Sequence, residues 1–134
     1  MERPGSMDKA QIEKALSQAM TAWNFMVPGF VLSTRFHYQL SNRFAFAWKL
    51  AVMKIPVVLV YLGFLDAHEM EDQSRSLLKS PLQWNTCVLN KSNGMIPQEA
   101  WNKTFDVQGT PLSVLIRSAS VGIISRSAKD ELLP

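Results

Sequence analysis

The feature that most constrains the fold is an uncharged run of nine apolar residues, 57–65, which follows directly on Pro56. The run has the length of a strand and is rich in valine and aromatic side chains. Such a run is typical of a strand covered on both faces in the middle of an α/β sheet. The longer stretch 44–65 approaches the length of a membrane span, but Lys49 and Lys54 lie within it and the proline interrupts it. We therefore predict a helix followed by a buried central strand, and no membrane segment.

Periodicity and breaker residues place the other elements. Apolar residues recur at helical spacing before residue 54, and proline or glycine marks most helix ends. A tight turn over residues 108–111 joins the last two strands. These patterns predict a small α/β fold, with α+β as the alternative, in which two long helices and one or two short ones pack a mixed sheet of about three strands. The predicted elements are helices over 8–27, 34–53 and 81–91, a short helix from Pro97, and strands over 57–65, 105–107 and 112–117.

Length and composition favour one domain. A chain of 134 residues with 47% hydrophobic residues can bury a packed core. We predict a single globular domain over residues 7–118, an expression-tag remnant over 1–6 and a flexible tail over 119–134. A single cysteine excludes an intramolecular disulfide framework, which favours a cytoplasmic location. The net charge of +3 permits an acidic partner such as nucleic acid but does not require one.

The segment FHYQLSNRFAF, residues 36–46, carries a family resemblance together with the apolar strand that follows it. Over residues 8–66 the chain resembles the C-terminal half of uncharacterised bacterial proteins related to PD-(D/E)XK nucleases, and YQLSNR is the most specific part. The nuclease core of that family has the element order α-β-β-β-α-β. The resemblance implies that this chain corresponds to the part of the core that follows the catalytic strands. In that family, the carboxylates of an acidic residue and of an acid-x-Lys pair hold the metal ion, and the lysine helps to orient the attacking water or to stabilise charge. No Asp or Glu here is followed two positions later by Lys, so no catalytic residue is assigned.

The predicted helix over 35–54 contains basic residues and no acidic ones. No acidic residue occurs between residues 14 and 65. The resemblance and the spacing single out Gln39 and Arg43, which are one helical turn apart, so that an amide and a guanidinium can contact one phosphate or base edge. The alternative is that these side chains brace the helix and that the lysines and arginines form a solvated face. The candidate nucleic-acid-binding residues are Arg35, Gln39, Arg43 and Lys49.

An acidic cluster follows the apolar strand directly. Carboxylates and an imidazole at the carboxyl end of a strand can bind a divalent cation such as Mg²⁺. An acidic loop that complements a helix dipole has the same composition, and this is the simpler interpretation. Apart from such an ion, no cofactor is predicted. The candidate metal ligands are Asp66, His68, Glu69 and Asp72.

A sheet of three strands leaves exposed edges and a partly uncovered apolar face. Pairing of two copies would cover both, so we predict a homodimer with an apolar interface. The function that fits these features is a non-catalytic binding or assembly protein on a nuclease-like half-fold. The alternatives are a nucleic-acid-binding module that uses the basic helix and a subunit of a split metal-dependent nuclease. The candidate interface residues are Trp23, Phe30, Phe36, Trp48 and Trp101.

Overall fold

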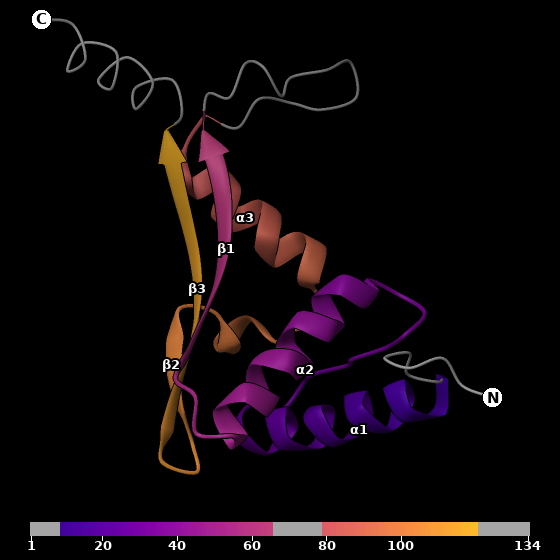
Figure 1. Ribbon diagram of the computed structural model, residues 1–134. Coiled ribbons are helices and arrows are strands. Elements are labelled where there is room, and N and C mark those ends of the chain that lie inside the picture. Colours follow the sequence, from indigo (N-terminus) through magenta and orange to yellow (C-terminus); the bar gives the residue numbers. More distant parts are fainter. Residues whose placement is uncertain (1–8, 66–78, 121–134) are drawn as a thin grey trace, which may run out of the picture. The chain divides into compact units, whose positions relative to one another are not determined.

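The computed structural model describes residues 9–65 and 79–120 of the chain (Figure 1). The described strands form one mixed sheet in the order β1-β3-β2, in which β1 and β3 run in the same direction. The predicted α/β class and the small mixed sheet are thus confirmed. The elements in chain order are α1 (Lys9–Met26), α2 (Tyr38–Val52), β1 (Val57–Leu65), α3 (Pro81–Ser92), the short 3-10 helix η2 (Gln98–Ala100), β2 (Lys103–Val107) and β3 (Thr110–Ser120).

The described residues fall into two compact units. The first contains residues 9–59 and 92–115, and the second contains 60–65, 79–91 and 116–120. The single domain predicted over 7–118 stays a prediction, and the expected tag remnant and most of the expected tail lie outside the described residues. None of the described helices is both long and apolar enough to span a membrane. The predicted cytoplasmic location stays a prediction.

Trp23 of α1 lies at the centre of the core of the first unit. Its ring stacks on Phe30, with ring centroids 4.9 Å apart, and meets Phe44 and Phe105 edge-on at 5.3 and 5.4 Å. Its Nε1 donates a hydrogen bond of 3.0 Å to the backbone oxygen of Phe44. Phe44 in turn meets Trp101 at 5.6 Å. One aromatic cluster therefore joins α1, the loop after it, α2 and β2.

Asn24 fixes the loop that follows α1. Its Oδ1 accepts hydrogen bonds from the backbone N–H groups of Gly29 and Phe30, at 2.9 and 2.6 Å. Its Nδ2 donates to the backbone oxygen of Phe30 at 3.0 Å. The next residue, Val31, donates its backbone N–H to the oxygen of Met95 at 2.8 Å. One side chain thus satisfies three backbone groups of the loop and holds Phe30 against the aromatic cluster.

We expect Asn24→Ala to lower the free energy of unfolding by about 1–3 kcal/mol, because loop groups that are partly buried lose their partners. Asn24→Asp keeps the oxygen acceptors and loses only the donor, so its effect should be smaller. Urea unfolding followed by circular dichroism measures both variants. Equal stability of the alanine variant and the wild type would contradict this role of Asn24.

The second helix begins later than predicted. The sequence predicted a helix over 34–53, whereas α2 begins at Tyr38, after His37 with a φ of 49°. A residue in this left-handed conformation does not continue a right-handed helix. Residues 34–37 therefore belong to a loop, in which the Ser33 Oγ accepts a hydrogen bond from the Arg35 N–H at 3.0 Å. The Ser33 N–H donates to the buried Ser41 Oγ at 3.0 Å, which ties this loop to α2.

The hairpin of β2 and β3 has a shorter turn than predicted. Val107 pairs with Thr110 in an antiparallel register, so the turn contains only Gln108 and Gly109. Both residues have a positive φ, of 51° and 89°, as two-residue hairpin turns require. The Gly109 N–H also donates to the Asp106 Oδ1 at 2.7 Å. The longer pairing extends both strands beyond their predicted bounds.

In the second unit, α3 packs on β1 through an indole ring. The Trp84 Nε1 donates a hydrogen bond of 3.0 Å to the backbone oxygen of Tyr61. A Cβ atom at Gly63 would lie 2.6 Å from Cγ and 2.7 Å from Cε2 of the same ring. Only a residue without a side chain fits at this crossing, which is a common reason for a glycine inside a strand.

β1 is an edge strand, which corrects the prediction of a central strand covered on both faces. It stands at the end of the sheet order, and alternate side chains are exposed. A run that is apolar at every position has no period that separates a covered face from an open one. The sequence therefore could not indicate that the strand is open on one side. The exposed residues are Val58, Val60, Leu62 and Phe64, with exposed fractions of 63, 43, 47 and 44%.

Candidate functional site

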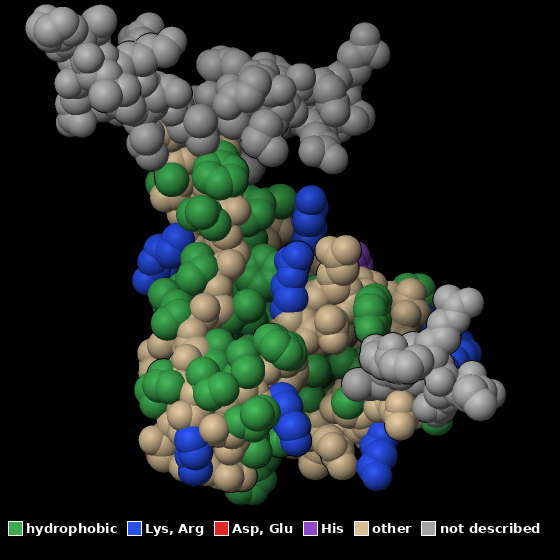
Figure 2. Space-filling model, in the orientation of Figure 1, with side chains coloured by type: hydrophobic (Ala, Val, Ile, Leu, Met, Phe, Trp, Pro, Cys, Tyr) green, Lys and Arg blue, Asp and Glu red, His purple; other side chains and the backbone are tan. Residues whose placement is uncertain are grey.

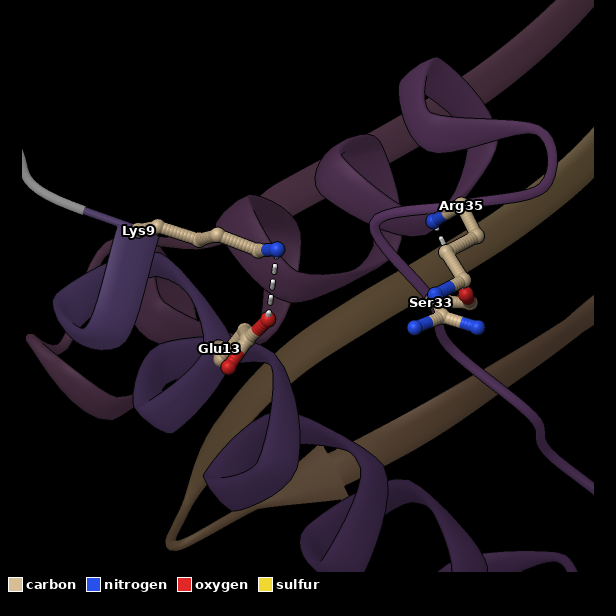
Figure 3. Close-up of polar contacts among 4 residues, drawn as sticks. All are labelled: Lys9, Glu13, Ser33 and Arg35. Atoms are coloured by element: carbon tan, nitrogen blue, oxygen red, sulfur yellow. Dashed lines mark hydrogen bonds and ion pairs between the residues drawn. The ribbon is translucent and has the colours of Figure 1, made fainter.

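The structure does not gather the four predicted nucleic-acid-binding residues on one face. All four are exposed. Gln39 and Arg43 lie one turn apart on α2, as predicted, but Lys49 is six residues beyond Arg43 and so about 120° around the helix. Arg35 lies in the loop before α2, where its backbone N–H contacts Ser33 (Figure 3). Only the Gln39 and Arg43 pair therefore keeps the arrangement that a shared phosphate contact needs.

An acidic side chain also lies near Arg35. Glu13 of α1 and Arg35 line the same shallow hollow, of about 250 Å³. Glu13 forms an exposed ion pair with Lys9, with 3.9 Å between Nζ and Oε1 (Figure 3). A carboxylate that lines the same hollow as the arginine weakens the attraction of this hollow for phosphate.

Because the predicted nucleic-acid-binding residues do not share one face, we expect the affinity of the chain for nucleic acid to fall only weakly as the salt concentration rises. One phosphate neutralised by Arg43 gives a slope of log affinity against log salt concentration of about −1. Gel-shift titration of a short duplex over a salt series measures the slope. A slope of about −3 or steeper would contradict the expectation, because the three predicted basic residues Arg35, Arg43 and Lys49, or their equivalents, would then act together.

The predicted metal ligands Asp66, His68, Glu69 and Asp72 lie outside the described residues. Within residues 9–65 and 79–120, no three His, Cys, Asp or Glu side chains gather in a group that could hold a metal ion. The thiol of Cys87 is free and half-buried on α3. The described residues therefore support no metal centre of their own.

Three of the five residues predicted for a dimer interface lie in the core of the chain itself, which corrects their assignment. Trp23, Phe30 and Trp101 are 0, 2 and 4% exposed, so they present almost no surface to a second copy. Phe36 is 70% exposed in the loop before α2. Trp48 is half-buried and lines a groove between α1 and α2.

Sequence reasoning expected exposed sheet edges but placed β1 in the middle of the sheet, so it did not assign the outer side of β1 as a candidate surface. Its residues 57–65 carry no charge, and within the described part of the chain no strand pairs with its outer edge. β2, at the other edge, has only five residues and includes Lys103 and Asp106. Charges and short length are the devices that normally prevent a sheet edge from pairing with another chain. β1 lacks both.

The open face of the sheet is apolar chiefly along β1. Figure 2 shows hydrophobic side chains following this strand. On β3, the alternate, less buried positions include the polar residues Ser113 and Arg117. On β2, Thr104 is exposed and shares a hydrogen bond of 2.7 Å with Ser113. The apolar surface is therefore concentrated at the edge of the sheet and not at its centre. We name Val58, Val60, Leu62 and Phe64 the β1 edge.

Comparison of the chain with protein-family models, with curated proteins and with solved structures gives no match. The resemblance of residues 8–66 to PD-(D/E)XK nuclease-like proteins stays a prediction.

Proposed function

We propose that the chain is a non-catalytic assembly protein that forms a homodimer through antiparallel pairing of two β1 edges. The observation that carries this proposal is an uncharged, nine-residue edge strand with exposed apolar side chains. A strand with a neighbouring strand on one side only can act as a template for a strand of another chain.

The distribution of apolar residues favours a partner beside β1 over one stacked on the sheet face. A partner stacked on the sheet face would cover Ser113 and Arg117 of β3 and Thr104 of β2. Burial of these polar groups would cost free energy unless the partner offered them hydrogen bonds. A strand added at the edge contacts the side chains of β1 first, because cross-strand neighbours have Cβ atoms only about 4.5–5.5 Å apart. The exposed valines, leucine and phenylalanine lie where such contacts form.

A second copy suits this edge because the pairing is self-complementary. Antiparallel pairing about a twofold axis at Tyr61, placed at a non-hydrogen-bonded position because its backbone oxygen already accepts from Trp84, sets Val58 opposite Phe64 of the second copy, and Val60 opposite Leu62 of the second copy. All these pairs are apolar, and β1 carries no charge that would repel its own copy. In an isologous contact of this kind, both chains use the same surface, so a pair of chains leaves no such surface free for a third. The outcome is a dimer with one continuous sheet and not an open fibre.

A charge-exchange experiment tests this register. We expect the double variant Val60→Lys, Leu62→Lys to be monomeric, because two pairs of lysines would lie opposite each other. The double variant Val60→Glu, Leu62→Glu should be monomeric for the same reason. Mixing the two should give a one-to-one heterodimer, since each lysine then faces a glutamate. Sedimentation velocity measures the mass of each sample.

Val31→Lys is the control, because it introduces a charge of the same sign at an exposed valine in the loop after α1. This variant should dimerise like the wild type. The proposal is overturned if the wild type is monomeric at about 100 μM, a concentration well above the Kd of a typical specific dimer. It is also overturned if the lysine and glutamate variants fail to associate on mixing.

A further inference from the structure

A second surface, independent of the β1 edge, lies within the first unit as a groove between α1 and α2. The groove has a volume of about 450 Å³, within the range of small-molecule sites. Its walls are mainly apolar: Ile12, Ala15 and Leu16 from α1, and Ala45, Phe46 and Trp48 from α2. Leu16 and Ala45 are buried and form its floor, whereas Phe46 is exposed along its side.

The polar groups of the groove are few and all suit a negatively charged ligand. Lys49 is the one charged side chain among its lining residues, Tyr38 adds a hydroxyl, and Gln18 and Asn42 add amides. The Lys49 side chain is exposed, and no described carboxylate forms an ion pair with it. No acidic residue occurs between positions 14 and 65 of the sequence. The ammonium group is therefore available to one external anion.

The lining residues of α2 extend along the helix away from Lys49, which places the positive charge at one end of this wall. Tyr38 and Lys49 are eleven residues apart on α2, which corresponds to about 16 Å along the helix. The apolar lining residues Ala45 and Phe46 lie between them in sequence. An extended aliphatic chain can lie over these side chains while its charged end reaches the lysine.

We propose that the groove between α1 and α2 binds a small amphipathic carboxylate, with its aliphatic chain on the apolar walls and its carboxylate paired with Lys49. One ammonium group matches one negative charge, and a charge-assisted hydrogen bond to it fixes the orientation of the chain. The apolar walls select for chain length, because each additional buried CH₂ group strengthens binding up to about fourfold.

Decanoate is the probe, and isothermal titration calorimetry below its micelle concentration measures its Kd. We expect saturable one-to-one binding to the full chain and binding of octanoate up to about 15-fold weaker, since two CH₂ groups are lost. Decylamine, which carries a cationic head on the same chain, should bind roughly tenfold or more weakly than decanoate because its head meets Lys49.

Two variants locate the site. Lys49→Gln should weaken decanoate binding by roughly tenfold or more, whereas Lys14→Gln, an exposed lysine of α1 outside the groove lining, should leave it unchanged. Ala15→Phe fills the groove from an exposed position on α1, so it should abolish binding while the thermal unfolding curve stays that of the wild type.

Three results would overturn this proposal. They are the absence of saturable decanoate binding to the wild type, equal affinity for decanoate and decylamine, and equal effects of the two lysine variants. The lysine double variant of the β1 edge should bind decanoate as the wild type does. Loss of the dimer with decanoate binding intact, or the reverse, therefore shows which of the two proposals has failed.

Discussion

Trp23→Ala is expected to lower the free energy of unfolding by about 3–5 kcal/mol, the range for removal of a large aromatic side chain from a core. The indole is fully buried and contacts three aromatic rings, so its removal leaves a cavity bounded by Phe30, Phe44 and Phe105. The change also leaves the backbone oxygen of Phe44 without the Nε1 donor at 3.0 Å. These losses act at a single point where four segments of the first unit meet.

Phe25 provides the matched control on the same helix. It lies two residues after Trp23 but is 91% exposed, so Phe25→Ala should change stability by less than about 0.5 kcal/mol. Trp23→Phe keeps one aromatic ring and loses the hydrogen bond, and its effect should lie between the two. Urea unfolding monitored by far-UV circular dichroism gives all three values. Similar losses for Trp23→Ala and Phe25→Ala would contradict the assignment of Trp23 to the centre of the core.

Gly63→Ala is expected to destabilise the packing of α3 on β1, with a cost of about 1–3 kcal/mol, typical of an overpacked site. The new methyl group would overlap the Trp84 ring, which is held in place by its hydrogen bond to the Tyr61 oxygen. The ring can move away only by giving up that bond. Thermal unfolding followed by near-UV circular dichroism reports both the stability and the environment of the indole.

A double-mutant cycle separates this clash from other effects of alanine in the strand. In a Trp84→Ala background the ring is absent, so adding Gly63→Ala should cost far less than it does in the wild type. Coupling of about 1 kcal/mol or more is expected for two groups in direct contact. Additive effects of the two changes would contradict the close approach of the indole to Gly63.

The elements that could be predicted from the sequence are those with breakers at their ends. Pro81 opens α3 as predicted, and the turn residues before Pro111 indicated the hairpin. The start of α2 could not be predicted, because the apolar spacing continues through residue 36 while the left-handed His37 interrupts the helix. Histidine carries no strong signal for that conformation, whereas glycine or asparagine would have given one.

The functional surfaces were harder to predict than the elements. Trp23 and Trp48 both occupy apolar helical positions, and nothing in their spacing separates a residue at the centre of the core from one that lines a groove. The place of a strand in the sheet depends on pairing between distant segments, here β1 with β3. The sequence analysis predicted exposed sheet edges, and the structure has one along β1. The residues that it named for the interface, however, are largely core residues, because their burial depends on contacts between distant segments.

Hydrogen exchange of the β1 amides at two protein concentrations tests the proposed assembly most directly. In an edge strand, alternate N–H groups point away from the sheet and exchange rapidly unless another strand accepts their hydrogen bonds. Pairing of two copies predicts that all amides of residues 58–65 are protected at high concentration, and that alternate ones become rapid on dilution. Rapid exchange of alternate amides at both concentrations, or protection that dilution does not change, would contradict the homodimer.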